Sequence, residues 1–98
     1  MLTANQIQTI QNYFLDKPIL KAELFGSYAK NTDTDNSDID ILVDLDYNQI
    51  IDLEFIQYQL DLEKLLDKKV DLISSRAISK YILPLIEHDK IVIYEQAK

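Results

Sequence analysis

The sequence predicts an α/β fold, a mixed β-sheet with helices packed on it. Segments whose apolar residues recur at helical spacing alternate along the chain with shorter segments typical of strands. The 98 residues fit one domain, residues 1–98, and no repeat or Gly/Ser-rich linker divides them. Hydrophobic residues at 47% and charged residues at 28% are ordinary globular values, so we expect a modest but real core.

The first element is a helix that begins at a capping box. In TANQ, Thr3 is the predicted N-cap, and the side chain of Gln6 reaches back to it. Apolar residues then follow at helical spacing, at Ile7, Ile10, Tyr13 and Phe14. Pro18 ends this helix because a residue that precedes proline is disfavoured in the α conformation.

Two strands follow in the first half of the chain. The first is ILKAELF at 19–25, which ends at Gly26, and the second is SDIDILVDL at 37–45. The second strand is polar at its start and strongly apolar after it. Between the strands, Ser27 and the residues YAK are expected to begin a short helix.

The longest helix is predicted over residues 50–66. One face is lined by Ile51, Phe55, Tyr58, Leu62 and Leu65. Three further residues widen this apolar face, namely Leu53, Ile56 and Leu60. A third strand, KKVDLIS at 68–74, comes directly after the helix.

The C-terminal part is predicted as a helix followed by a last strand. Ser74 or Ser75 caps a helix that runs to about residue 88. Pro84 either kinks that helix or starts a second short one at its first position. The last strand is KIVIYE at 90–95.

The net charge of −7 disfavours a nucleic-acid partner, because a phosphate backbone is repelled on average. Metal cations and a basic protein partner suit this charge better. The absence of cysteine excludes disulfides and thiolate metal sites. No segment approaches the roughly 20 apolar residues of a membrane span, and MLTANQIQTI lacks the pattern of a signal peptide, so we expect no membrane partner and a cytoplasmic location.

Gly26 is the only glycine of the chain, and it stands at the head of the acidic stretch GSYAKNTDTDNSDID. Such a residue answers a local need, either a positive φ or the close approach of a ligand to the backbone. Asp33, Asp35 and Asn36 in this stretch are typical of a solvated loop.

Asp38 and Asp40 differ from that loop because they alternate with Ile39 and Ile41 in a strand pattern. Residues two apart in a strand point to the same face, roughly 6.5 to 7 Å apart. Like charges so placed raise each other's proton affinity unless a cation intervenes, and a hard cation such as Mg²⁺ prefers these oxygen ligands. A calcium loop that starts at Asp33 is excluded, because Asp38 stands where that loop requires glycine.

Asp71 lies between Val70 and Leu72 in the third strand. It is either an edge-strand aspartate that faces water or a third carboxylate of the same site. The second reading requires its strand to pair with that of Asp38 and Asp40, about 4.8 Å away. Three carboxylates brought together in this way suit two metal ions about 3.5 to 4 Å apart.

The Gly26–Ser27 turn is predicted to lead from a strand into a helix. Free backbone N–H groups at a helix start bind phosphate, and glycine lets the phosphate approach closely. Phosphate donors beside a carboxylate–metal cluster describe a phosphoryl- or nucleotidyl-transfer site.

These motifs resemble the minimal nucleotidyltransferases of the DNA polymerase β-like nucleotidyltransferase superfamily. The resemblance is carried by Gly26 and Ser27, by SDIDILV at 37–43 and by Asp71 in KKVDLI, and it covers nearly the whole chain. It implies a single small nucleotidyltransferase domain. It also implies attack on the α-phosphate of a nucleoside triphosphate, with loss of pyrophosphate.

The resemblance assigns the catalytic and metal-binding roles to the three aspartates. Asp38 and Asp40 match the two metal-binding carboxylates, which implies Mg²⁺ and two ions of it. Asp71 matches the third carboxylate, which helps to hold metal and activates the attacking hydroxyl.

The resemblance assigns nucleotide binding to Gly26, Ser27 and Lys30, with ATP as the substrate. Lys30 falls where the family usually carries arginine, so it keeps the charge but loses the bidentate fork. Asn31 falls where glycine is usual and still tolerates a left-handed backbone.

Minimal members of this family typically pair with a HEPN-domain ribonuclease toxin. The resemblance therefore implies an antitoxin that transfers AMP to a hydroxyl of the toxin, often that of a tyrosine. Two alternatives stay open: neutralisation of the toxin by complex formation alone, and nucleotidyl transfer to a small molecule or RNA that needs a second subunit. The intact set of Asp38, Asp40 and Asp71 argues against the first.

Overall fold

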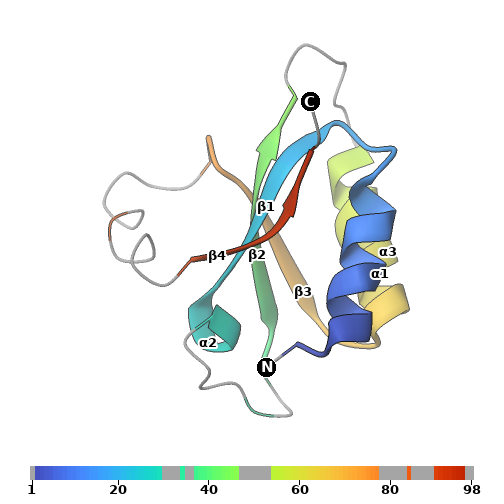
Figure 1. Ribbon diagram of the computed structural model, residues 1–98, viewed down its shortest axis with the longest axis vertical. Coiled ribbons are helices and arrows are strands. Elements are labelled where there is room, and N and C mark those ends of the chain that lie inside the picture. The colour runs from blue at the N-terminus through green and yellow to red at the C-terminus, as the bar shows by residue number, and fades with distance from the viewer. Residues whose placement is uncertain are drawn as a thin grey trace.

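A computed structural model confirms the α/β class and, within the described residues, the order of the four strands and the first three helices (Figure 1). The structure describes residues 2–29, 34, 37–46, 54–77, 84 and 90–96, and of Ser27 the backbone alone. The elements are α1 (Ala4–Phe14), β1 (Ile19–Phe25), α2 (Gly26–Ala29), β2 (Ile39–Leu45), α3 (Glu54–Leu66), β3 (Val70–Ser74) and β4 (Ile91–Glu95).

The described strands form one mixed sheet in the order β3-β2-β1-β4. β1 is antiparallel to both β2 and β4, whereas β2 and β3 are parallel. A parallel pair needs a crossover connection, and α3 lies on the path from β2 to β3. Figure 1 shows α1 and α3 side by side on one face of the sheet, while α2 lies at the end of β1, away from them.

The capping box at the start of α1 is confirmed. The backbone N–H of Gln6 donates to Oγ1 of Thr3 at 3.1 Å, and the N–H of Thr3 donates to Oε1 of Gln6 at 2.9 Å. The helix thereby satisfies two N–H groups that have no partner within a helix. Its inner face buries Ile10 and Phe14 completely.

The side chains of β2 alternate between the two faces of the sheet. Ile39, Ile41 and Val43 are fully buried in the core shared with the helices. Each such burial stabilises the fold by roughly 1.5 to 3 kcal/mol. Asp40, Leu42 and Asp44 point to the other face, which we call the open face because α1 and α3 do not cover it; Leu42 is buried there, whereas the two aspartates are half-buried. The helices therefore fix which side of the sheet carries the carboxylates.

The broad apolar face predicted for the longest helix is wrong in part. Tyr58, Leu62 and Leu66 of α3 are buried, but three predicted members of that face are exposed. The exposed fractions are 59% for Ile56, 48% for Leu60 and 55% for Leu65. The reason is geometric, because a helix that lies on a sheet covers only a stripe of its circumference. Residues 50–53, including Ile51 and Leu53, lie outside the described residues.

The helix predicted from Ser74 or Ser75 to about residue 88 is not seen at its start. Residues 75–77 form a turn, in which the N–H of Ala77 donates to the carbonyl of Ser74 at 2.9 Å. The rest of this prediction lies outside the described residues, apart from Pro84, which is helical. None of the helices in the described ranges is long and apolar enough to cross a membrane.

Candidate active site

Asp40 and Asp71 are direct neighbours across the parallel pair of β2 and β3. Val70 and Leu72 on either side of Asp71 are buried in the core, so Asp71 points to the open face, as Asp40 does. Strands so paired are about 4.8 Å apart, which brings the two carboxylates side by side. The sequence left open whether Asp71 faces water from an edge strand or lies with Asp40. Asp71 is exposed on β3, an edge of the described sheet, and the register of this strand pair also places it beside Asp40.

Asp38 lies just before β2, on the same side of the chain as Asp40 by strand parity, and it is exposed. The negative charge of Asp38 is close enough to raise the pKa of Asp40. Burial, and then the charges of Asp71 and Asp38, raise the pKa of Asp40 from 3.8 to about 6. Asp40 is therefore the carboxylate on which burial and like charges act together, as expected where a bound cation normally balances the site.

Gly26, which follows β1, lies against the carboxylate of Asp40. Phe25 pairs with Asp40 in the register of β1 and β2, and the chain turns directly after it. Gly26 has a φ of +71°, in the left-handed region that favours glycine. A methyl group at this position would overlap with Oδ2 of Asp40. The positive φ expected of the only glycine is thus present, and the group that lies close to its backbone is the carboxylate of Asp40.

The remaining predicted nucleotide-binding groups are only partly described. The backbone of Ser27 belongs to α2, directly after Gly26, whereas its side chain lies outside the described part of the chain. Lys30 and Asn31 also lie outside the described residues, as do Asp33, Asp35 and Asn36.

The candidate metal-binding side chains on this face are carboxylates, whose oxygens are the ligands that a magnesium ion prefers. Among the described residues, no group of three or more His, Cys, Asp or Glu side chains is placed where it could hold a metal ion, so Asp38, Asp40 and Asp71 do not by themselves form the three-carboxylate cluster that was expected. Mg²⁺ seldom needs one, because it is usually held by one or two carboxylates together with substrate phosphates and water. Asp40 beside Asp71, with Asp38 close enough to act on Asp40, meets that requirement. The residues therefore fit Mg²⁺ that arrives with a nucleotide.

The open face also carries a buried ion-pair group that the sequence analysis missed. Glu23 of β1 is only 8% exposed, and its Oε1 lies 3.3 Å from Nζ of Lys90 and 3.7 Å from Nζ of Lys21. The sequence carried one signal for this group, because the charged residues Lys21 and Glu23 alternate with apolar residues in β1 and so share one face of the strand. Lys90 gave no such signal, because it is 67 residues further along the chain.

With this geometry in place, comparison with known proteins identifies the family. Residues 8–98 match the model of the family described as polymerase beta, nucleotidyltransferase. The chain belongs to this family, and its predicted enzyme class, a nucleotidyltransferase, is confirmed.

Relatives of known sequence agree with this class. A Methanocaldococcus jannaschii protein, provisionally named a protein adenylyltransferase, is 46% identical over 71 residues, which cover 71% of each chain. A second protein of this organism with the same kind of name is 45% identical over 75 residues, which cover 71% of this chain and 72% of the relative.

Solved structures confirm the fold. A toxin–antitoxin structure with AMP-PNP matches with a TM-score of 0.75 and 25% identity, over 97% of this chain and 75% of the other. A complex of a tri-AMPylated Shewanella oneidensis HEPN toxin with an MNT antitoxin matches with a TM-score of 0.64, over 94% and 69% of the two chains. At 23% identity, this match indicates that the two chains share a fold and nothing more.

Proposed function

We propose that this chain is a Mg²⁺-dependent adenylyltransferase that transfers AMP from ATP to a hydroxyl of a HEPN-type toxin and thereby acts as its antitoxin. The observation that carries the proposal is the pairing of Asp40 with Asp71 on the open face, with Gly26 against Asp40. The provisional names of the relatives and the AMP-PNP in the matched toxin–antitoxin structure support the donor and the reaction. The proposal treats residues 1–98 as one domain that works in the cytoplasm.

The roles of the residues follow from their places. Asp38 and Asp40 would hold magnesium, with Asp71 helping. When bound, Mg²⁺ neutralises negative charge on the phosphates of ATP. The absence of a side chain at Gly26 lets the carboxylate of Asp40 lie directly against the turn, so a larger residue there would displace this proposed metal ligand. The backbone of Ser27 continues this turn into α2.

The acceptor hydroxyl oxygen forms a bond to the α-phosphorus of ATP, and the bond from that phosphorus to the oxygen that bridges to the β-phosphate breaks. Pyrophosphate leaves with the electron pair of the broken bond. The hydroxyl proton passes to Asp71, which lies next to Asp40 and is open to solvent. AMP stays on the acceptor as a phosphodiester.

A tyrosine of a HEPN-type toxin is the acceptor that we propose. A phenol, with a pKa near 10, loses its proton more readily than the hydroxyl of serine or threonine. The adenylyl group adds bulk and a negative charge, which blocks a ribonuclease site and repels RNA phosphates. The tri-AMPylated HEPN toxin of the matched complex supports a HEPN toxin as the acceptor protein.

The proposal is tested by intact-mass measurement of a HEPN protein encoded next to this chain. It is incubated with ATP and Mg²⁺ and with either the parent chain or the Asp38→Asn/Asp40→Asn variant. We expect the mass of one or more adenylyl groups to appear with the parent only. A toxin that is neutralised equally by both chains without any mass change would favour neutralisation by complex formation alone.

A further inference from the structure

The outer surface of α3 combines exposed aliphatic side chains with two hollows. Ile56 and Leu60 are one helical turn apart and 59% and 48% exposed. Since the opposite side of α3 already supplies the core residues Tyr58 and Leu62, burial in this chain does not explain them. Two large aliphatic residues at this spacing are a common anchor pattern of helix-mediated contacts.

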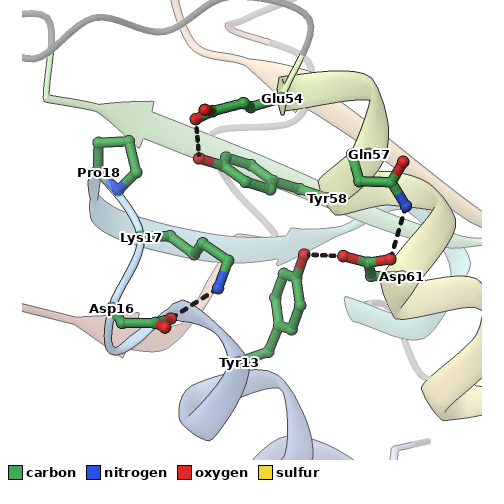
Figure 2. Close-up of a pocket in the computed structure, with 8 residues that line it drawn as sticks. All are labelled: Tyr13, Asp16, Lys17, Pro18, Glu54, Gln57, Tyr58 and Asp61. Atoms are coloured by element: carbon green, nitrogen blue, oxygen red, sulfur yellow. Dashed lines mark hydrogen bonds and ion pairs between the residues drawn. The ribbon is translucent and has the colours of Figure 1, made fainter.

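The first hollow lies between the end of α1 and α3 and measures about 410 Å³. Figure 2 shows Tyr13 from α1 and Tyr58 from α3 in it, with Asp61 reaching the hydroxyl of Tyr13. The two rings meet edge to face, with centroids 6.2 Å apart. The ammonium of Lys17 lies 4.5 Å from the centroid of the Tyr13 ring, so this ring face already accepts a cation.

The second hollow, about 480 Å³, lies along α3 beside the first. Leu60 lines it, and Gln57 and Asp61 line both hollows. The amide of Gln57 donates to Oδ1 of Asp61 at 2.7 Å, and the hydroxyl of Tyr13 donates to its Oδ2 at 2.5 Å. These hydrogen bonds, that from Tyr13 first, lower the pKa of Asp61. A carboxylate fixed in this way stays charged between the two hollows.

The charge around the hollows is acidic. Their lining includes five carboxylates, those of Asp16, Glu54, Asp61, Glu63 and Asp67, against the two lysines Lys17 and Lys64. Lys17 is already paired, because its Nζ lies 2.6 Å from Oδ1 of Asp16. With the chain's net charge of −7, this surface repels a second copy of itself and attracts a basic segment.

We propose that this surface, the docking face of α3, binds a basic amphipathic segment of the HEPN-type partner. An aliphatic side chain of that segment packs against Ile56 and Leu60, and its arginine or lysine side chains enter the acidic hollows. The identity of the partner rests on the proposed function, whereas the chemistry of the segment rests on the docking face.

This arrangement separates docking from chemistry. α3 packs on β3, which is an edge of the described sheet, and Asp71 lies on the open face of that same strand. A partner held on α3 therefore needs to pass only one strand to bring a hydroxyl to the carboxylates. Substitutions on the docking face are therefore expected to weaken binding of the partner, whereas substitutions of the aspartates are expected to reduce AMP transfer.

The test measures the affinity of the HEPN protein for variants built in the Asp38→Asn/Asp40→Asn background, so that transfer does not alter the partner. Leu60→Lys removes the anchor and adds a like charge, and Leu65→Lys is the matched control on the same helix, 55% exposed and outside both hollows. We expect Leu60→Lys to weaken binding by roughly 30-fold and Leu65→Lys by less than about twofold. Lys64→Glu, which makes the second hollow more acidic, is expected to tighten binding by about threefold at low salt.

Equal affinities of the Leu60→Lys and Leu65→Lys variants, or no binding of the HEPN protein by the background chain, would overturn the docking face. Unchanged or weaker binding by Lys64→Glu would overturn the basic partner segment. AMP transfer by the parent chain is measured separately. If the parent chain transfers AMP but Leu60→Lys binds the HEPN protein as tightly as Leu65→Lys does, only the docking face fails. If Leu60→Lys binds more weakly but the parent chain transfers no AMP, only the proposed function fails.

Discussion

The carboxylate of Asp40 occupies the space beside Gly26 that a side chain at residue 26 would fill. This contact joins the turn after β1 to the carboxylate pair on β2 and β3. It makes the only glycine of the chain a part of the candidate site and not only of the turn.

Gly26→Ala is expected to destabilise the chain by roughly 1 to 2 kcal/mol from the left-handed backbone alone. The overlap with Asp40 adds to this cost, and ATP binding in the presence of Mg²⁺ weakens further. Urea unfolding and calorimetric ATP titration measure the two effects. In an Asp40→Ala background the folding cost should fall to the backbone part, since the overlapping oxygen is gone. Parent-like ATP affinity of Gly26→Ala would contradict the assignment of the turn.

Asp40→Asn is expected to stabilise the metal-free chain at pH 8. The folded-state pKa of Asp40 is raised to about 6, so its ionised form is disfavoured. Stability from this group is therefore fully present below pH 3.8 and is lost as the pH rises through about 6. A shift of this size corresponds to about 3 kcal/mol, and because Asp40 is only half-buried, solvent screening reduces it to about 1 kcal/mol.

Urea unfolding between pH 4.5 and 8 in EDTA measures this effect. The parent should lose stability across that range relative to Asp40→Asn. Asp44→Asn is the matched control, because Asp44 lies on the same strand and face but stands opposite Lys21, and not opposite another aspartate, in the strand register. A metal-free Asp40→Asn chain that is less stable than the parent at pH 8 would mean that Asp40 is a structural residue.

The division of α3 into a buried and an exposed side predicts unequal costs for three leucine truncations. Leu62→Ala should lower the free energy of unfolding by about 2 to 5 kcal/mol, because Leu62 is fully buried. Leu60→Ala and Leu65→Ala should change it by less than about 0.5 kcal/mol. Chemical denaturation of the three variants is the measurement. Equal losses in all three would restore the broad core face first predicted from the sequence.

The sequence was sufficient for the four strands and for α1, α2 and α3 because each depends on local signals, such as the capping box at Thr3 and the alternation around Asp40. It failed at Ser74 and Ser75, where a predicted N-cap is followed by a turn. It was not sufficient for contacts between distant segments. The Asp40–Asp71 register and the burial of Glu23 against Lys90 depend on strand order, which local patterns do not contain. The exposure of Ile56 and Leu60 was missed for the same reason, since periodicity does not show how far the sheet covers a helix.

The rate of AMP transfer to the HEPN protein by aspartate variants tests the central claim most directly. We compare the parent chain with Asp40→Asn, Asp71→Asn and the control Asp44→Asn, at saturating ATP and Mg²⁺ and with folding verified for each. If the Asp40–Asp71 pair performs the chemistry, the first two variants lose at least about 100-fold in rate, while Asp44→Asn stays within about twofold of the parent. If Asp40→Asn and Asp71→Asn transfer AMP as fast as Asp44→Asn, the open face is not the active site.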